Sequence, residues 1–357
     1  MPATYNEFGQ IDDLEIVSIR ERSDLAFPTS LAQFQCLFPD DAACAAYLEK
    51  ARWEHGFVCP RCEERREPYR FVSRPGVLRC KTCRRDVALT AGTVMERTHS
   101  PLVTWFWGAY LVSSLTPGLS AVQFQRQLGL SRYETAFQIL HKLRAGMVRP
   151  DRGRIGGNLG RGDRVEIDDM WIGDALRGKA HAGRDQALVV AAVEVLQRKP
   201  KEGGTTPRRS RRHAGRLRMD VLHDCGTMSL CGFVEAAVEP KAPVVTDDWS
   251  SYATLADRGY RHRVVVYGAK PEVAEEYLSM VRLVFLNLKS WLQGTHHGVS
   301  SKHLQAYLNE FVFRFNRRLA PFSAFRSLLG IGASAESPTY HDLYSGEWKH
   351  PRISGHR

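Results

Sequence analysis

The apolar positions after residue 163 form short runs and longer periodic stretches. Runs rich in Val and Ile predict strands at 165–173, 187–196, 216–224, 243–248 and 262–267. Apolar residues spaced three and four apart predict helices at 228–238, 272–293 and 300–318. Three strands, one helix and then further strands and helices predict a mixed α/β sheet for residues 164–320, followed by a tail over 321–357.

The residues before this sheet are mainly helical in pattern. Residues 1–50 are expected to form a helical lead-in that lacks the basic and apolar regions of a signal peptide. The apolar stretch PLVTWFWGAYLVSSL at 101–115 predicts a buried helix, because it is too short to span a bilayer. These features predict a cytoplasmic protein without a membrane partner.

Two helices joined by a short turn are predicted within residues 99–149. The signals are an N-cap, a glycine stop and a second N-cap at Ser120, Gly129 and Ser131. The second helix carries an apolar stripe formed by Ala136, Ile139, Leu140, Leu143 and Met147. This outline favours a helix-turn-helix-like DNA-binding segment, with Arg132 and Lys142 as exposed contacts, and the alternative is a plain helical hairpin.

Two close cysteine pairs lie between these helical parts, within residues 51–98. The pairs are CPRC and CKTC, formed by Cys59, Cys62, Cys80 and Cys83. Seventeen residues separate the pairs, enough for a short hairpin that brings the two turns together. Four thiolates can complete the tetrahedral shell of a structural Zn²⁺ ion. The pattern therefore predicts a zinc ribbon, and the alternative is a set of thiols without metal.

A Gly- and Arg-rich linker at 150–163 leads into a strand that contains acids. In VEIDDMWIG, strand alternation places Glu166 and Asp168 on one face and Asp169 on the other. A later apolar strand ends at Asp247. Two carboxylates that converge at strand ends are suitable ligands for Mg²⁺, although acids at strand ends are common without one.

The charge of the chain is concentrated in one segment. The 357 residues carry a formal net charge of +11, and residues 198–218 alone hold nine Lys or Arg and one Glu, a net of +8. This stretch is expected to be an insertion between two strands. It could clamp DNA through Arg208, Arg209, Arg211 and Arg212, since neutralised phosphates release counterions, or it could simply be solvated.

Across residues 30–345 the sequence resembles bacterial insertion-sequence transposases of the DDE superfamily, in the group with a zinc ribbon ahead of the catalytic core. The matching pieces are CPRC…CKTC, LSAVQFQRQLGLSRYETAFQILHKLR, VEIDDMWIG, VVTDDWSSY, LNLKSWLQGTHHGVSSKHLQAYLNEFVFRFNRR and SPTYHDLY. The resemblance implies a ribonuclease H-like core and DNA cleavage and strand transfer at terminal inverted repeats, with Mg²⁺ or Mn²⁺. It implies Asp168 and Asp247 as the first two metal ligands.

The third site residue is where the chain departs from the superfamily, which usually places Glu there. Asn287 is our choice, because relatives in this group are similar in having Asn. Another common arrangement puts a basic residue seven positions after the acid, but counting back from Lys289 lands on Arg282, which cannot bind a metal. Glu310 is the rival, although Arg314 four residues later favours an internal ion pair. Lys289 is expected to meet phosphate or to form an ion pair.

The implied partner is double-stranded DNA, both the element's ends and its target, bound by a homo-oligomer. Two other functions remain open at this point. An inactive or domesticated copy would only bind DNA, and a ribonuclease H-like nuclease would cut without strand transfer.

Overall fold

The computed structural model describes residues 28–53, 55–148, 153–173, 186–197, 212–266 and 276–319, together with 324, 325, 328 and 329. The chain divides into two compact units. One consists chiefly of residues 11–149 and 317–349, and the other chiefly of residues 150–316. Each unit is described by itself.

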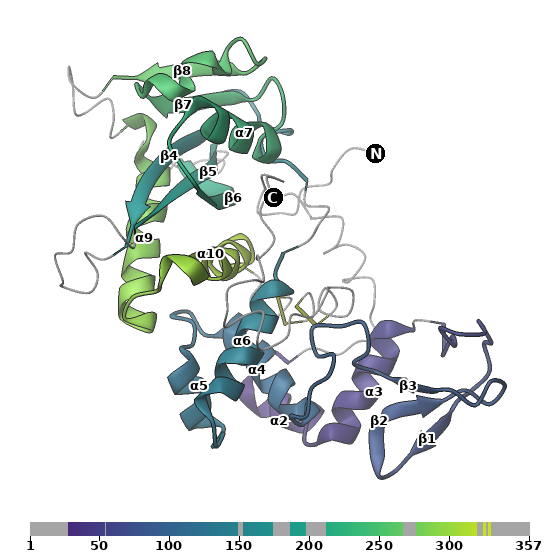
Figure 1. Cartoon of the computed structure of the whole chain (residues 1–357). Helices are drawn as coiled ribbons and strands as arrows, with labels where there is room; N and C mark the ends of the chain where they lie inside the picture. The colour runs from purple at the N-terminus through teal and green to yellow at the C-terminus, as the bar shows by residue number, and fades with distance from the viewer. Residues whose placement is uncertain are drawn as a thin grey trace, which may run out of the picture. The chain divides into compact units, whose positions relative to one another are not determined.

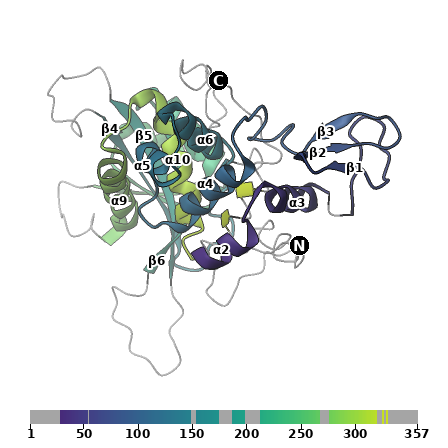
Figure 2. The same cartoon turned by 90° about the horizontal axis from the view of Figure 1, so that it is seen from below.

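Two helices and a small antiparallel sheet open the described part of the first unit: α2 (Leu31–Leu37), α3 (Asp41–Arg52), β1 (Tyr69–Phe71), β2 (Arg74–Arg79) and β3 (Asp86–Ala88). Strand β2 is central and pairs with both neighbours. The Arg52 guanidinium donates to the backbone carbonyls of Ala88 and Leu89, which ties the end of α3 to the end of the sheet. Figures 1 and 2 both show α3 beside this sheet.

Three further helices complete the described first unit: α4 (Leu102–Ser114), α5 (Ala121–Gln127) and α6 (Tyr133–Ala145). They pack closely where α4 carries Gly108. A Cβ atom at this position would lie 3.1 Å from Leu143 Cδ1 and 3.2 Å from Phe124 Cζ, so any larger residue would push α5 and α6 away. The predicted stripe is buried throughout, with Ala136, Ile139, Leu140 and Leu143 on α6 and Met147 two residues beyond its end.

The second unit is built on a five-stranded sheet: β4 (Arg164–Ile172), β5 (Ala187–Gln197), β6 (Arg212–Leu222), β7 (Pro243–Asp247) and β8 (Arg261–Val265). The strand order is β6-β5-β4-β7-β8. Strands β4, β5 and β6 are antiparallel, whereas β7 and β8 run parallel to β4. This mixed sheet has the ribonuclease H-like order that the pattern and the resemblance predicted.

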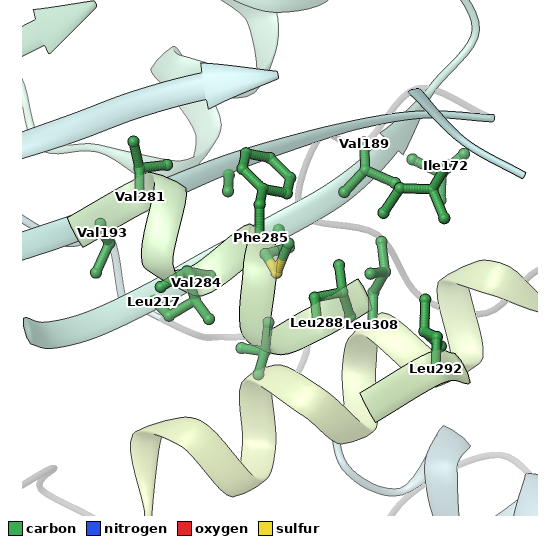
Figure 3. Packing of buried hydrophobic residues seen from close by; sticks show 14 of the residues in the cluster. Ile172, Val189, Val193, Leu217, Val281, Val284, Phe285, Leu288, Leu292 and Leu308 are labelled. Carbon is green, nitrogen blue, oxygen red and sulfur yellow. The ribbon is translucent and has the colours of Figure 1, made fainter. Parts of the chain in front are cut away.

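Helices cover both faces of this sheet. Helix α7 (Thr227–Ala237) and the 3₁₀ helix η3 (Ser250–Leu255) pack on one face, with Val165, Ile167 and Val244 in the core between. Helices α9 (Ser279–His296) and α10 (Ser301–Asn316) pack on the other. Figure 3 shows Phe285 projecting from α9 toward the strands, close to Val189 and Val281. We call these the α7 face and the α9 face.

The elements agree with the predicted ones except at some ends. Strand β6 begins at Arg212 rather than 216, so part of the expected insertion is strand, and residues 198–211 lie outside the described residues. Helix α9 begins at Ser279; residues 272–275 of the longer predicted helix also lie outside them. Ser120 caps α5 as predicted, but the N-cap of α6 is Arg132 rather than Ser131, and it makes no side-chain cap bond.

Candidate metal centres and DNA-binding surfaces

The four cysteines of the two pairs meet at one end of the small sheet. The ligand atoms of Cys59, Cys62, Cys80 and Cys83 all lie within 4.8 Å of one another. The Sγ atoms of Cys59 and Cys83 are 3.6 Å apart, and those of Cys62 and Cys80 are 3.7 Å apart. Four sulfur donors gathered around one point suit a tetrahedral Zn²⁺ ion held without an open position, as in structural sites.

Each pair sits in the same kind of backbone turn. The N–H of Glu63 donates to the carbonyl of Cys59, and the N–H of Arg84 donates to the carbonyl of Cys80. Glu63 and Arg84 both adopt left-handed backbone conformations, with φ of 56° and 59°. A left-handed residue directly after the second cysteine turns the chain back and points both thiols inward. Sequence spacing predicted the turns, but not these two strained non-glycine residues.

The carboxylates of the second unit converge through strand register. Strands β4 and β7 are parallel neighbours in which Glu166 pairs with Val245. Two residues further along each strand, Asp168 lies beside Asp247, where β7 ends. The alternation of β7 gives Asp247 the same side as Val245, which packs on the α9 face. The two acids therefore meet on the α9 face of the sheet.

This meeting is electrostatically unfavourable without a cation. Burial raises the pKa of Asp168 to about 7, and repulsion from Asp247 and Asp169 adds to that increase. Burial also raises the pKa of Asp247, while a hydrogen bond of 3.2 Å from the Trp249 N–H to Asp247 Oδ1 opposes the shift. Paired carboxylates that repel one another are a donor set that fits a divalent metal ion, which would relieve the repulsion.

Glu166 lies on the same face of β4 as Asp168, but its carboxylate already has other partners. Its carboxylate is fully buried and paired with the Arg164 guanidinium, with Arg164 Nη2 2.6 Å from Oε1. Its Oε2 accepts hydrogen bonds from the backbone N–H groups of Met280 and Val281, at 2.8 and 3.1 Å. Glu166 therefore anchors the first turn of α9.

Asp169 points to the α7 face, as strand alternation predicted. It is partly buried, and Asp169 Oδ1 accepts a hydrogen bond of 2.8 Å from the Tyr252 hydroxyl of η3. Tyr252 is fully buried. Strand alternation predicted the face of Asp169 but not its partner, and Asp169 joins β4 to η3. An Asp–Tyr pair 83 residues apart leaves no local signal, so only the fold could reveal it.

Helix α9 presents Arg282 toward the acid pair. The Arg282 charge lowers the pKa of both Asp168 and Asp247, although burial, the largest effect in each case, raises the pKa and the net shift is upward. Asn287 is exposed and lies about 140° around the helix from Arg282. Lys289 is half-buried and lies within about 20° of Arg282, two turns further along. Arg282 thus lies within electrostatic range of both acids, and Asn287 lies on another side of α9.

Glu310 lies away from the acid pair. It is fully buried on α10, with Oε1 3.8 Å from Arg314 Nη1. Helix α10 is fixed to strand β6, since Gln305 accepts from the Val221 N–H and Asn316 accepts from the Leu217 N–H. One strand separates β6 from β4, which carries Asp168, and two strands separate it from β7, so the spacings are roughly 10 and 14 Å. Glu310 therefore forms an ion pair with Arg314 of its own helix.

The expected DNA contacts differ in their surroundings. Arg132 is exposed at the start of α6. The expected exposure of Lys142 is wrong: it is only 4% exposed, and its ammonium donates a 3.1 Å hydrogen bond to the Glu96 carbonyl. Arg212 is half-buried and donates to the Glu276 carbonyl, 3.2 Å away. Arg208, Arg209 and Arg211 lie outside the described residues.

Comparison with known protein families gives two matches in different parts of the chain. A family described as ISXO2-like transposase domain matches residues 160–316. A family described as transposase zinc-ribbon domain matches residues 39–86. No curated protein and no solved structure matches the chain. In the parts of the chain that the structure describes, no helix has the length and apolarity needed to cross a bilayer.

Proposed function

The chain belongs to the insertion-sequence transposases that carry a zinc ribbon ahead of a DDE-type domain, and from this premise we propose that it cuts and joins DNA at the ends of its own element. The observation that carries the proposal is the meeting of Asp168 and Asp247 on one face of a ribonuclease H-like sheet. The proposed place of action is the cytoplasm.

The proposed chemistry is phosphodiester hydrolysis followed by transesterification. Asp168 and Asp247 would hold Mg²⁺ or Mn²⁺, which when bound activates an attacking oxygen and stabilises the leaving one. The sheet positions the two carboxylates through the parallel pairing of β4 and β7. The Trp249 N–H orients Asp247, and Glu166 fixes the helix that covers the pair.

The metal site that we propose rests on these two acids. Asn287 is exposed on another side of α9 from Arg282, and Glu310 is buried over β6, so their placement supports neither as the third ligand. We expect the Asn287→Ala and Glu310→Ala variants to cleave DNA equally well. Glu310→Ala should be the less stable of the two, because Glu310 fills a buried position beside Arg314 and Asn287 does not.

The proposed DNA contacts combine the first unit with the basic segment. The zinc ribbon and the α5–α6 pair would bind the terminal inverted repeats, with Arg132 exposed at the start of α6. Arg208, Arg209, Arg211 and Arg212 would add phosphate contacts, as would Lys289. Assembly as a homo-oligomer on paired ends is part of this proposal.

The test is metal-dependent nicking and strand transfer with DNA that carries the element's own ends. We expect Asp168→Asn and Asp247→Asn each to lower the nicking rate by at least about 100-fold, while DNA binding persists. The matched control is Asp257→Asn, which alters an exposed aspartate of the same unit and should leave the rate unchanged.

Equal nicking by wild type and both site variants would refute the site. DNA binding by a wild-type chain that neither nicks nor joins would instead favour an inactive copy that acts only as a DNA-binding protein. Nicking without strand transfer into a target plasmid would favour a simple nuclease.

A further inference from the structure

Arg282 occupies the point on α9 where a third metal ligand would be expected. It lies seven residues before Lys289, which is the spacing at which the superfamily commonly has an acid. Its location is well defined, because the Met280 and Val281 N–H groups are hydrogen bonded to Glu166. Asp168 follows Glu166 by two residues on the same face of β4. The first turn of α9 therefore brings Arg282 to the acid pair.

The charge of Arg282 acts on both acids at once. Its guanidinium is near enough to interact electrostatically with both Asp168 and Asp247. Arg282 is itself exposed, whereas Asp168 and Asp247 are partly buried. A guanidinium stays protonated throughout the usable pH range, and it has no lone pair to offer a metal ion.

We propose that Arg282 is a resident counter-ion of the acid pair and competes with the divalent metal ion for it. Two carboxylates and one guanidinium carry a net charge of −1, whereas two carboxylates alone carry −2. Affinity for hard divalent ions rises with the charge of the ligand set. The chain therefore binds Mg²⁺ and Mn²⁺ more weakly than its two aspartates would allow. This inference rests on the proposed function, because it takes Asp168 and Asp247 as the metal ligands.

The experiment measures Mn²⁺ binding to the zinc-loaded, DNA-free full chain by isothermal titration calorimetry. Arg282→Gln removes the competing charge, and we expect it to lower the dissociation constant for Mn²⁺ by about tenfold. Arg282→Glu adds a third carboxylate and should lower it further. Adding Asp168→Asn to either variant should abolish the gain.

The matched control is Arg261→Glu, which makes the same charge change at the other end of the sheet. Arg261 is exposed at the start of β8, and Asp247 lies beside Val265 at its end. We expect the control to bind Mn²⁺ as wild type does. Thermal melting shows whether each variant is folded. If Arg282→Glu does not fold, the Mn²⁺ affinity of Arg282→Gln alone tests the inference.

The inference is overturned if folded Arg282→Gln binds Mn²⁺ no more tightly than wild type, whether both bind or neither does. It is equally overturned if the gain survives Asp168→Asn or appears in Arg261→Glu. These results are separate from the nicking test. If wild type and Arg282→Gln bind Mn²⁺ equally well and both need Asp168, the role of Arg282 is rejected and the proposed function stays intact.

Discussion

Four acids on strands β4 and β7 have similar side chains and different surroundings. Glu166 is buried against Arg164, and Asp169 accepts a hydrogen bond from Tyr252. Asp168 and Asp247 have each other, a hydrogen bond from a neighbouring backbone N–H and an exposed Arg282. The first two acids are satisfied by the fold, whereas the second two are held together against their repulsion. Such repulsion lowers stability, and functional sites commonly retain it because the ligand relieves it.

Replacing Asp168 with Asn should therefore stabilise the protein at high pH when no Mg²⁺ or Mn²⁺ is added. The pKa of Asp168 rises from 3.8 to about 7 on folding, so the folded protein loses stability as the pH increases through that interval and Asp168 ionises. We expect the variant to unfold with a free energy about 1 to 2 kcal/mol larger than wild type at pH 8 and with a smaller difference at pH 5.

Urea unfolding of zinc-loaded protein at the two pH values measures this difference. Asp257→Asn again serves as the control, because its exposed carboxylate has no such repulsion to relieve. A stability gain that is the same at pH 5 and pH 8, or no gain at all, would show that the carboxylates are not in repulsion.

At the scale of elements, helix α9 packs on the face of the sheet that carries the candidate site. Val281, Phe285 and Leu288 bury its inner face against the strands. Glu166 accepts from the N–H groups of Met280 and Val281, which lie in the first turn, where no intrahelical acceptor is available. One buried carboxylate thus satisfies the helix start and balances Arg164. The position of Arg282 next to the acids depends on this anchor.

Glu166→Ala should destabilise the second unit strongly, by about 3 to 5 kcal/mol, because it leaves Arg164 buried and unpaired. The midpoint of urea unfolding measures the loss. The matched control is Glu235→Ala on α7, whose partner is Arg258 at 2.6 Å. The Glu235 side chain is 46% exposed, so its loss should cost less than about 1 kcal/mol. Similar losses for both variants would mean that Glu166 is an ordinary ion-pair residue and not an anchor.

At the scale of the whole molecule, the two units have separate cores and different means of stabilisation. The small sheet of the first unit has three strands, two of them three residues long, and depends on its cysteine cluster. The five-stranded sheet of the second unit is covered on both faces by apolar cores. A metal that holds the first sheet together should therefore contribute little to the second.

Removal of zinc by a chelator should unfold the ribbon and leave the second unit intact. Hydrogen exchange should accelerate by at least about 100-fold over residues 69–88, where structural zinc supplies much of the folding free energy. Exchange in the central strand β5 (Ala187–Gln197) should stay slow. Alkylation before and after zinc removal gives a second measurement: the exposed Cys62 should become reactive once the zinc is gone, while the buried Cys44 stays inert because burial raises its pKa to about 12.

Unchanged exchange in the ribbon after complete zinc removal would show that the three strands hold without metal. The Cys62→Ser variant allows the same comparison of hydrogen exchange in the ribbon and in β5, because it removes one zinc ligand without a chelator.

Much of this protein follows from its sequence alone. The spacing of the cysteine pairs, the order of strands and helices after residue 163 and the stripe of α6 are local patterns, and local patterns report local structure. Tertiary structure decided which polar groups are paired. Lys142 is buried and donates to the Glu96 carbonyl, Asp169 accepts a hydrogen bond from Tyr252, and Arg282 interacts electrostatically with Asp168 and Asp247. These partners are 35 to 114 residues apart, and no periodicity relates them. Strand register and helix packing bring them together, and burial then makes each pairing energetically significant.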